Sequence, residues 1–89
     1  MTLIKFYGYY REKIGENSIE VRGAYTLQEL LEKLKEELKE KKEILFENGK
    51  LKRNILLAVN DDLVSLDNIA EVYISDKDTV SIMPLPSGG

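Results

Sequence analysis

Residues 2–7 alternate in polarity in the way expected of a strand that is buried on one side. Ile4 and Phe6 fall on one face of such a strand, whereas Lys5 and Tyr7 fall on the other. Aromatic and branched side chains favour a strand, and the glycine that follows ends the run. We therefore expect a first strand here, with Tyr7 turned away from the core.

A second strand is predicted a short distance along the chain. Residues 9–15 are polar and few, which allows a single helical turn. Residues 18–22 then alternate again, with Ile19 and Val21 on the buried face. Because the connection is so short, the two strands are expected to form an antiparallel pair.

A capping box marks the start of the main helix. Thr26 is a favourable N-cap residue, and Glu29, three positions later, is of the type that completes the box. Leucines then recur at the spacing of one helical face, at positions 27, 30, 31, 34 and 38. Glutamate and lysine fill the opposite face, which we interpret as a solvated surface. The helix is expected to fade after about Lys42, before a turn at Asn48-Gly49.

Three further strands are predicted in the second half of the chain. Residues 55–60 are mostly apolar, as in a well-covered central strand, and residues 63–66 form a short return strand. The last strand covers residues 79–83, where a valine and an isoleucine point one way and Met83 points the other. The segment 67–73 is a poor helix candidate.

This order of elements predicts an α+β fold of the β-grasp (ubiquitin-like) type, in which a small mixed sheet packs against one main helix. A ferredoxin-like sandwich would need a second helix of similar length, for which the sequence offers no good candidate. We expect a single β-grasp domain over residues 1–83, followed by a flexible C-terminal tail over residues 84–89.

Composition narrows the class of protein. The chain has 89 residues, of which 43% are hydrophobic and 33% charged, as is typical of a globular domain. Its 13 basic and 16 acidic residues are mixed along the chain and give a net charge of −3, so no basic stripe suits nucleic acid. The apolar runs are too short to span a bilayer, and no signal peptide is recognised. We expect a cytoplasmic protein that contacts neither nucleic acid nor membrane.

The residue types present limit the available chemistry. The chain contains neither cysteine nor histidine, so it offers no thiolate nucleophile and lacks the usual general base and the commonest metal ligand. Two pairs of carboxylates remain, Asp61 with Asp62 and Asp76 with Asp78, which we interpret as solvated turn residues. Glycine-rich phosphate motifs are missing. We therefore expect no bound cofactor or metal, and no catalytic machinery in the chain itself.

The C-terminal segment, Pro84-Leu85-Pro86-Ser87-Gly88-Gly89, carries the candidate chemistry. Its two prolines fix φ and bias the leucine between them toward extended geometry, while glycines without Cβ can pass through a narrow channel. A carboxylate at Gly89 is a poor electrophile, so a partner must activate it, for instance as an acyl-adenylate. Once activated, it can accept sulfur to become a thiocarboxylate, or accept an amine to form an isopeptide. A terminal pair of glycines can equally be a frayed end.

Several stretches of the sequence together resemble a known family. They are Ile4-Lys5-Phe6-Tyr7-Gly8 with Arg11-Glu12 and Gly15, Thr26 at the helix start, Leu57-Ala58-Val59-Asn60 with Leu63-Val64-Ser65, Asp78-Thr79-Val80, and Pro84 through Gly89. Through them nearly the whole chain resembles the small subunit of molybdopterin synthase, a ubiquitin-like sulfur carrier, and its thiamine-pathway relatives. Chain length and the Arg-Glu segment favour the molybdopterin branch.

The resemblance implies partners and a mechanism. An adenylating enzyme resembling ubiquitin-activating enzyme would use ATP to convert the Gly89 carboxylate to an acyl-adenylate, and sulfur transfer would give a thiocarboxylate. The tail would then enter the active site of the large subunit of molybdopterin synthase and donate its sulfur to a pterin precursor. The resemblance further implies an apolar docking surface and a tail that bind these partners. The binding residues would be Tyr7, Leu63 and Met83 on the domain and Pro84, Leu85, Pro86 and Ser87 in the tail, and Gly88 would belong with Gly89 to the reactive end.

Three alternatives stay open. The chain could be a ubiquitin-like protein modifier that is conjugated to lysines through Gly89, because this role uses the same activated terminus. It could serve the thiamine pathway as a sulfur carrier. It could also be a non-covalent β-grasp interaction module that does not use its C-terminal glycines.

Overall fold

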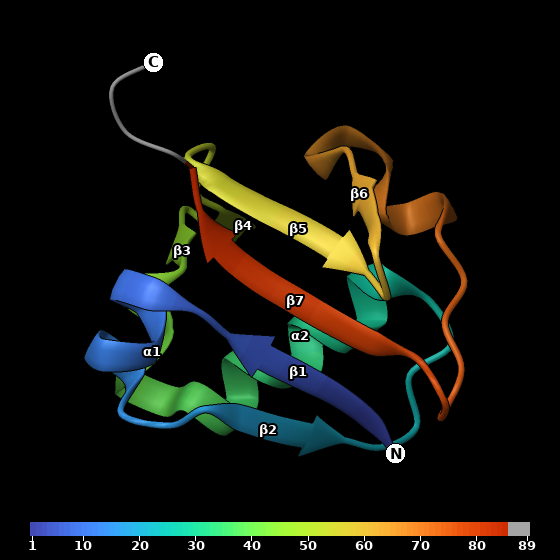
Figure 1. The fold of residues 1–89 in the computed structure, drawn as a ribbon, viewed down its shortest axis with the longest axis horizontal. Helices are drawn as coiled ribbons and strands as arrows, with labels where there is room; N and C mark the ends of the chain where they lie inside the picture. Colours follow the sequence, from blue (N-terminus) through green and yellow to red (C-terminus); the bar gives the residue numbers. More distant parts are fainter. Residues whose placement is uncertain (86–89) are drawn as a thin grey trace.

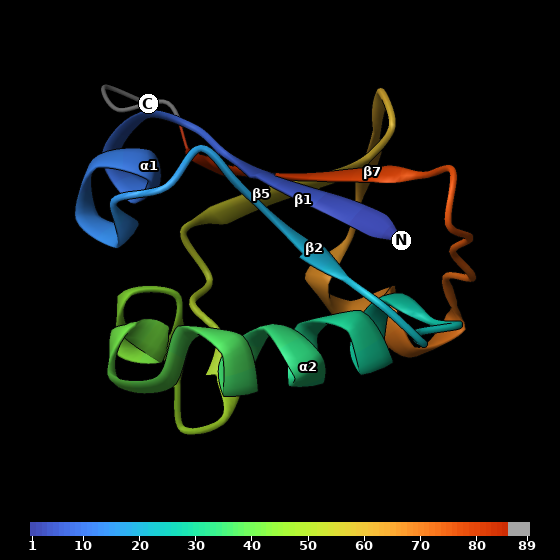
Figure 2. The ribbon, with the colours of Figure 1, turned by 90° about the horizontal axis from the view of Figure 1, so that it is seen from below.

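A computed structural model of the protein describes residues 1–85 and contains a five-stranded mixed sheet with one long helix across a single face (Figures 1 and 2). A two-stranded hairpin, a shorter helix and two 3₁₀ segments complete the described chain. In chain order the elements are β1 (Thr2–Phe6), α1 (Gly8–Ile14), β2 (Ser18–Val21), α2 (Leu27–Leu38), η1 (Lys39–Ile44), β3 (Phe46–Glu47), β4 (Lys50–Leu51), β5 (Ile55–Val59), β6 (Asp62–Val64), η2 (Leu66–Glu71) and β7 (Thr79–Pro84).

The main helix α2 begins with the predicted capping box. The Thr26 hydroxyl accepts a hydrogen bond from the Glu29 backbone N–H at 3.1 Å, and the Glu29 carboxylate accepts one from the Thr26 N–H at 3.0 Å. All five predicted leucines are buried. The helix ends at Leu38 rather than near Lys42, because Lys39 adopts a positive φ of 55° and the chain continues as the 3₁₀ segment η1.

The strand order of the large sheet is β2-β1-β7-β5-β6. The first strand β1 runs antiparallel to β2 and parallel to β7, whereas β7 and β5 are antiparallel, as are β5 and β6. At the centre, Ile82 of β7 pairs with Phe6 on one side and with Leu57 on the other. With α2 packed against one face, this is the β-grasp arrangement expected from the sequence.

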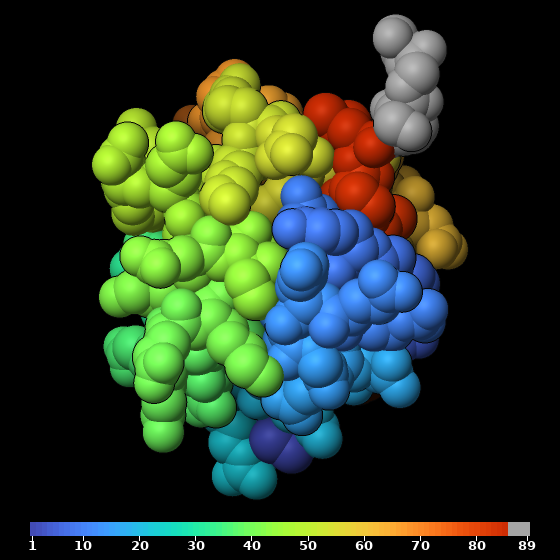
Figure 3. All heavy atoms as spheres, turned by 90° about the vertical axis from the view of Figure 1, so that its left-hand side faces the viewer, coloured from blue at the N-terminus to red at the C-terminus, as the bar shows by residue number. Residues whose placement is uncertain are grey.

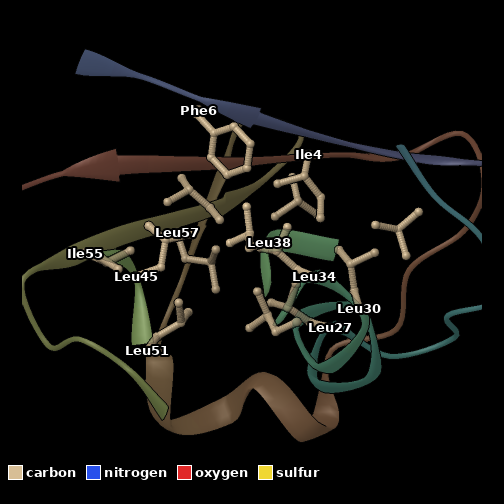
Figure 4. Packing of buried hydrophobic residues seen from close by; sticks show 14 of the residues in the cluster. Ile4, Phe6, Leu27, Leu30, Leu34, Leu38, Leu45, Leu51, Ile55 and Leu57 are labelled. Atoms are coloured by element: carbon tan, nitrogen blue, oxygen red, sulfur yellow. The ribbon is translucent and has the colours of Figure 1, made fainter. Parts of the chain in front are cut away.

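The core lies between α2 and the sheet, where the two apolar faces meet (Figure 4). Alternate residues of the central strands point toward the helix, and the leucines of α2 point back at them. Side chains with 0% exposure from both layers are Ile4, Leu27, Leu30, Leu34, Val80 and Ile82. The opposite face of the sheet has no helix over it in Figure 2 and faces outward.

The segment before β2 is more regular than predicted. In place of a single turn, α1 is a helix of 7 residues that buries Tyr10 and Ile14 against the core. Its last turn is held from another part of the chain, because the Lys41 ammonium donates a hydrogen bond to the Ile14 carbonyl at 2.8 Å. The positive charge of this ammonium also interacts favourably with the negative end of the helix dipole. None of the helices within residues 1–85 is long and apolar enough to cross a bilayer.

Two small elements differ from the sequence prediction. The predicted turn at Asn48-Gly49 joins β3 and β4, whose strand pairing was not foreseen. The return strand ends at Val64 rather than residue 66. The segment after it forms the short 3₁₀ segment η2 and no second helix comparable to α2, in agreement with the prediction. In a 3₁₀ turn, residues three apart share a face, and Leu66 and Ile69 accordingly pack together against the core.

Candidate functional site

The last described residues leave the sheet along a fixed path. β7 extends one residue beyond the predicted end, to Pro84, which pairs with Ile55. The next residue, Leu85, donates its backbone N–H to the carbonyl of Asn54 at 3.2 Å. The domain therefore holds the chain through Leu85, whereas the sequence had placed the start of the tail at residue 84.

The start of α1 lies against the same end of β7. Gly8 has φ of +56°, and a Cβ built on it would lie 3.3 Å from the Pro84 Cγ. One residue earlier, the Tyr7 N–H donates to the Ile82 carbonyl at 3.1 Å. Figure 3 shows the end of β7 beside the first residues of α1, with no space between them. The positive φ and the closeness of Pro84 both favour a glycine here.

Every second residue of the central strands points away from α2. These residues form the outward surface of the sheet, the side that faces the viewer in Figure 1. We call this surface the outer sheet face. Its members on β1, β7, β5 and β6, together with the residue just after β1, are Leu3, Lys5, Tyr7, Thr79, Ser81, Met83, Leu56, Ala58 and Leu63.

The three residues of the predicted docking surface all belong to the outer sheet face. Met83 pairs with Leu56 on one side of β7. On the other side, Phe6 pairs with Ile82 in the parallel register, so the next residues of the two chains, Tyr7 and Met83, lie side by side. Leu63 pairs with Ala58 on the far side of the sheet. Tyr7 is 39% exposed and Leu63 68% exposed, and Met83 is half-buried. An apolar surface of this kind is typical of a protein interface, and the docking role of these residues stays a prediction.

The tail residues of the prediction divide into two groups. Pro84 is half-buried and closes the end of β7, and Leu85 is 45% exposed where the chain leaves the sheet. Pro86, Ser87, Gly88 and Gly89 lie outside the described residues.

Three further residues belong to this site and were not singled out from the sequence. Gly8 and Asn54 hold the end of β7, and Lys5 lies within the outer sheet face. The position of Gly8 directly after a strand was a usable signal, since a chain that leaves a strand sharply needs a residue that tolerates positive φ. Asn54 acts through its backbone carbonyl. Because every residue has this group, the sequence contains no signal for its role.

The predicted turn carboxylates include one with a structural role. Asp61, Asp62 and Asp76 are exposed as expected, and Asp76 lies 3.6 Å from the N-terminal ammonium. Asp78 differs because it accepts hydrogen bonds from the Asn60 side-chain amide at 3.1 Å and the Ser75 N–H at 2.8 Å. These two hydrogen bonds lower the pKa of the Asp78 carboxyl. Asp78 therefore fixes the turn that leads into β7.

No group of three or more acidic, histidine or cysteine side chains within residues 1–85 is arranged to hold a metal ion. A pocket of about 330 Å³ lies between α2, the β3–β4 hairpin and η2, on the helical side of the sheet. Two ion pairs occupy its rim, Lys35 with Glu32 at 2.8 Å and Arg53 with Asp67 at 2.9 Å. The pocket is thus separate from the outer sheet face.

The sequence was compared with protein-family models and with curated proteins. The ThiS family matches residues 4–89 of the chain. No curated protein matches it significantly by sequence.

Solved structures with the same fold are numerous. A chain of the Amycolatopsis orientalis BexX/CysO complex is 29% identical over 100% of both chains, with a TM-score of 0.77. Urm1 from Trypanosoma brucei is 25% identical, with 99% of this chain and 94% of that chain covered and a TM-score of 0.72. The small archaeal modifier protein 1 of Methanosarcina acetivorans is 23% identical, with coverages of 99% and 95% and a TM-score of 0.79, and supports the fold alone.

Proposed function

Because the chain belongs to the ThiS family and has the β-grasp fold of ubiquitin-like sulfur carriers, we propose that it carries sulfur on a thiocarboxylate at Gly89. We propose further that it acts as the small subunit of molybdopterin synthase and donates this sulfur to a pterin precursor. The chemistry would then reside at the carboxylate of Gly89, and the catalytic groups would belong to partner enzymes.

One structural observation carries this proposal. The central strand β7 ends beside an apolar surface, and its last residues are held on both sides, by Gly8 and by Asn54. A partner that covers Tyr7, Met83 and Leu63 would therefore receive the following residues from a fixed starting point. Fixing a reactant relative to a catalyst lowers the entropic part of the barrier, which is the advantage of a carrier over a free carboxylate.

The proposed chemistry proceeds in two steps on the adenylating partner. A Gly89 carboxylate oxygen attacks the α-phosphorus of ATP, and pyrophosphate leaves. Hydrosulfide, or an enzyme-bound equivalent, then attacks the carbonyl carbon of the acyl-adenylate, and AMP leaves with the bridging oxygen. Every side chain within residues 1–85 has only a binding or positioning role in this scheme.

The final step belongs to the complex with the large synthase subunit. There the thiocarboxylate sulfur would be transferred to the pterin precursor, and water would return Gly89 to a carboxylate. The molybdopterin branch is favoured over the thiamine branch by the Arg11-Glu12 segment and the chain length.

Mass spectrometry of the intact protein tests the carrier role. The protein is incubated with the adenylating enzyme of the same genome, ATP, Mg²⁺ and sulfide. We expect the mass to rise by the difference between sulfur and oxygen, with the change located in the C-terminal peptide that ends at Gly89. Deletion of Gly88 and Gly89 is the control and should abolish the change. An active adenylating enzyme that leaves the full chain unmodified would contradict the proposal.

A protein modifier would share the first step, because a lysine amine can attack the same acyl-adenylate. The two roles differ in their products, so peptides with lysines linked to Gly89 would indicate conjugation. Addition of the large synthase subunit and pterin precursor to the thiocarboxylated protein distinguishes the branches further. Formation of a dithiolene supports the molybdopterin role, and its absence with an active large subunit would count against that role.

A further inference from the structure

Lys5 occupies an unusual position in the outer sheet face. Sheet register places it in a row that crosses four strands, because Lys5 pairs with Ser81, Ser81 with Ala58, and Ala58 with Leu63. The two central side chains of this row are small and almost fully covered, with exposures of 9% for Ser81 and 5% for Ala58. They separate the longer side chains of Lys5 and Leu63, both of which are exposed.

Lys5 is also the single charged side chain among the outward positions of β1, β7, β5 and β6. The other outward residues of β1, β7, β5 and β6 are apolar, serine or threonine. On β2, Glu20 also points outward. It pairs with Leu3, while Lys5 pairs with Ser18, so Glu20 is the diagonal cross-strand neighbour of Lys5.

No ion pair within residues 1–85 involves Lys5. The three ion pairs among the described residues join Met1 to Asp76, Lys35 to Glu32 and Arg53 to Asp67. The ammonium of Lys5 is therefore exposed to solvent and forms no ion pair in the described part of the free protein.

Covering this face removes the solvent that stabilises the ammonium. A charge that is buried in an interface without a partner is strongly unfavourable, whereas one matched by an opposite charge gives specificity and a faster encounter. A purely apolar partner surface would fit the rest of the face but not Lys5. The surface that docks here must therefore supply an anion at one position.

We infer that Lys5 is a specificity-determining residue, which pairs with a carboxylate of the adenylating partner at the β1 side of the apolar surface by which that partner binds. This inference rests on the proposed function, since every branch of that proposal begins with adenylation. A second copy of the chain is a poorer occupant of the face, because the single outward acidic residue of the sheet strands, Glu20, lies on the edge strand β2 and already neighbours Lys5 within its own chain.

Steady-state kinetics of adenylation test the inference. ATP–pyrophosphate exchange is measured with the full-length chain and the adenylating enzyme of the same genome, for the unmodified protein and for Lys5→Glu, Lys5→Met and Lys5→Arg. We expect Lys5→Glu to raise the KM for the carrier about tenfold or more with kcat unchanged, because the mismatch acts on docking and not on the tail. Lys5→Met should raise KM less and reduce its dependence on salt, and Lys5→Arg should behave as the unmodified protein.

A matched control uses an exposed lysine on α2, away from the outer sheet face. Lys33→Glu makes the same change in net charge and should leave KM within about twofold. Urea unfolding of each variant shows whether the fold is retained. A KM for Lys5→Glu as low as that of Lys33→Glu, with the unmodified protein fully active, would overturn the inference. Absence of exchange with the unmodified protein would instead contradict the proposed function.

Discussion

Gly8 and Pro84 lie so close together that the first residue of α1 and the last residue of β7 determine each other's position. A methyl group on Gly8 would lie 3.3 Å from the Pro84 Cγ, in addition to the strain of φ at +56°. On the other side, the Asn54 carbonyl accepts the Leu85 N–H. The end of the domain is thus clamped between a helix start and the loop before β5.

Substitution of Gly8 should affect both the stability of the domain and the position of the chain after Pro84. We expect Gly8→Ala to lower the free energy of unfolding by about 1–3 kcal/mol, because the residue must keep a left-handed conformation and Pro84 must shift. The shift should also slow thiocarboxylation at Gly89. Urea denaturation and the mass-spectrometric assay measure the two effects.

Gly23 provides the matched control for this prediction. It also has positive φ, of +76°, but a Cβ there would approach only the end of the flexible Lys33 side chain, at 3.8 Å. Gly23→Ala should therefore cost stability through its backbone alone and leave the rate of thiocarboxylation unchanged. Equal losses of rate in both variants would show that Pro84 does not position the tail.

The outer sheet face should contribute to partner affinity through Leu63. This side chain is 68% exposed, so Leu63→Ser should change the free energy of unfolding by no more than about 0.5 kcal/mol. If a partner covers it, the same change should weaken binding about tenfold or more. Titration calorimetry with the adenylating enzyme provides the dissociation constant.

A substitution of Tyr73 serves as the control for Leu63→Ser, because it also removes an exposed, largely apolar side chain. Tyr73 is 79% exposed and lies outside the outer sheet face, in the segment that bridges to Thr26. Tyr73→Ser should leave the affinity unchanged. An affinity lowered equally by both substitutions would exclude a specific role for Leu63.

The capping box makes stability depend on pH through Glu29. The backbone N–H groups of Tyr25 and Thr26 donate to its carboxylate and lower its pKa below the ordinary value of 4.5. Because the folded state prefers the ionised carboxylate, this contribution is fully present above pH 4.5 and is lost as the pH falls through the lowered pKa.

Urea unfolding as a function of pH measures this contribution. Glu29→Gln should be less stable than the unmodified protein at pH 7, and the difference should shrink as the pH falls below 4.5. Glu36→Gln removes an equal charge from the exposed face of α2 without touching the cap. A difference at pH 7 that persists unchanged in acid would contradict the role of the Glu29 carboxylate.

Lys35 should hold the β3–β4 hairpin against α2. Its ammonium donates to the Gly49 carbonyl at 2.6 Å and lies 5.1 Å from the centre of the Phe46 ring. Lys35→Met keeps much of the apolar stem but loses these contacts, and we expect opening of the hairpin to become easier by about 1 kcal/mol. Hydrogen exchange at the hairpin amides reports this opening. Lys33→Met, on the same helix, should leave that exchange unaffected.

Sequence alone was sufficient where the determining signal is local. Thr26 and Glu29 are three residues apart and form the capping box by themselves, and the leucines behind them have the period of one helical face. The alternation of Lys5 and Tyr7 with the buried residues of β1 likewise followed from strand geometry. These patterns need no knowledge of the rest of the chain.

The features that were missed depend on distant residues. α1 is too short to be stable alone, and its regularity comes from burial of Tyr10 and Ile14 and from the hydrogen bond of Lys41. The clamp of Gly8 and Asn54 on the end of β7 brings together three separate parts of the chain. Neither the parallel pairing of β1 with β7 nor the row that contains Lys5 can be obtained from local periodicity.

The central place of β7 has a consequence for the order of events during synthesis. Of the described strands it is the last to leave the ribosome, yet it separates β1 from β5, so the sheet cannot close until residues 79–84 have emerged. Pairing between the two ends of a chain is slow to form, because a long loop must be closed first. An incompletely made or misfolded chain would have no continuous outer sheet face beside its terminus. A partner that recognises this face would thereby select folded molecules.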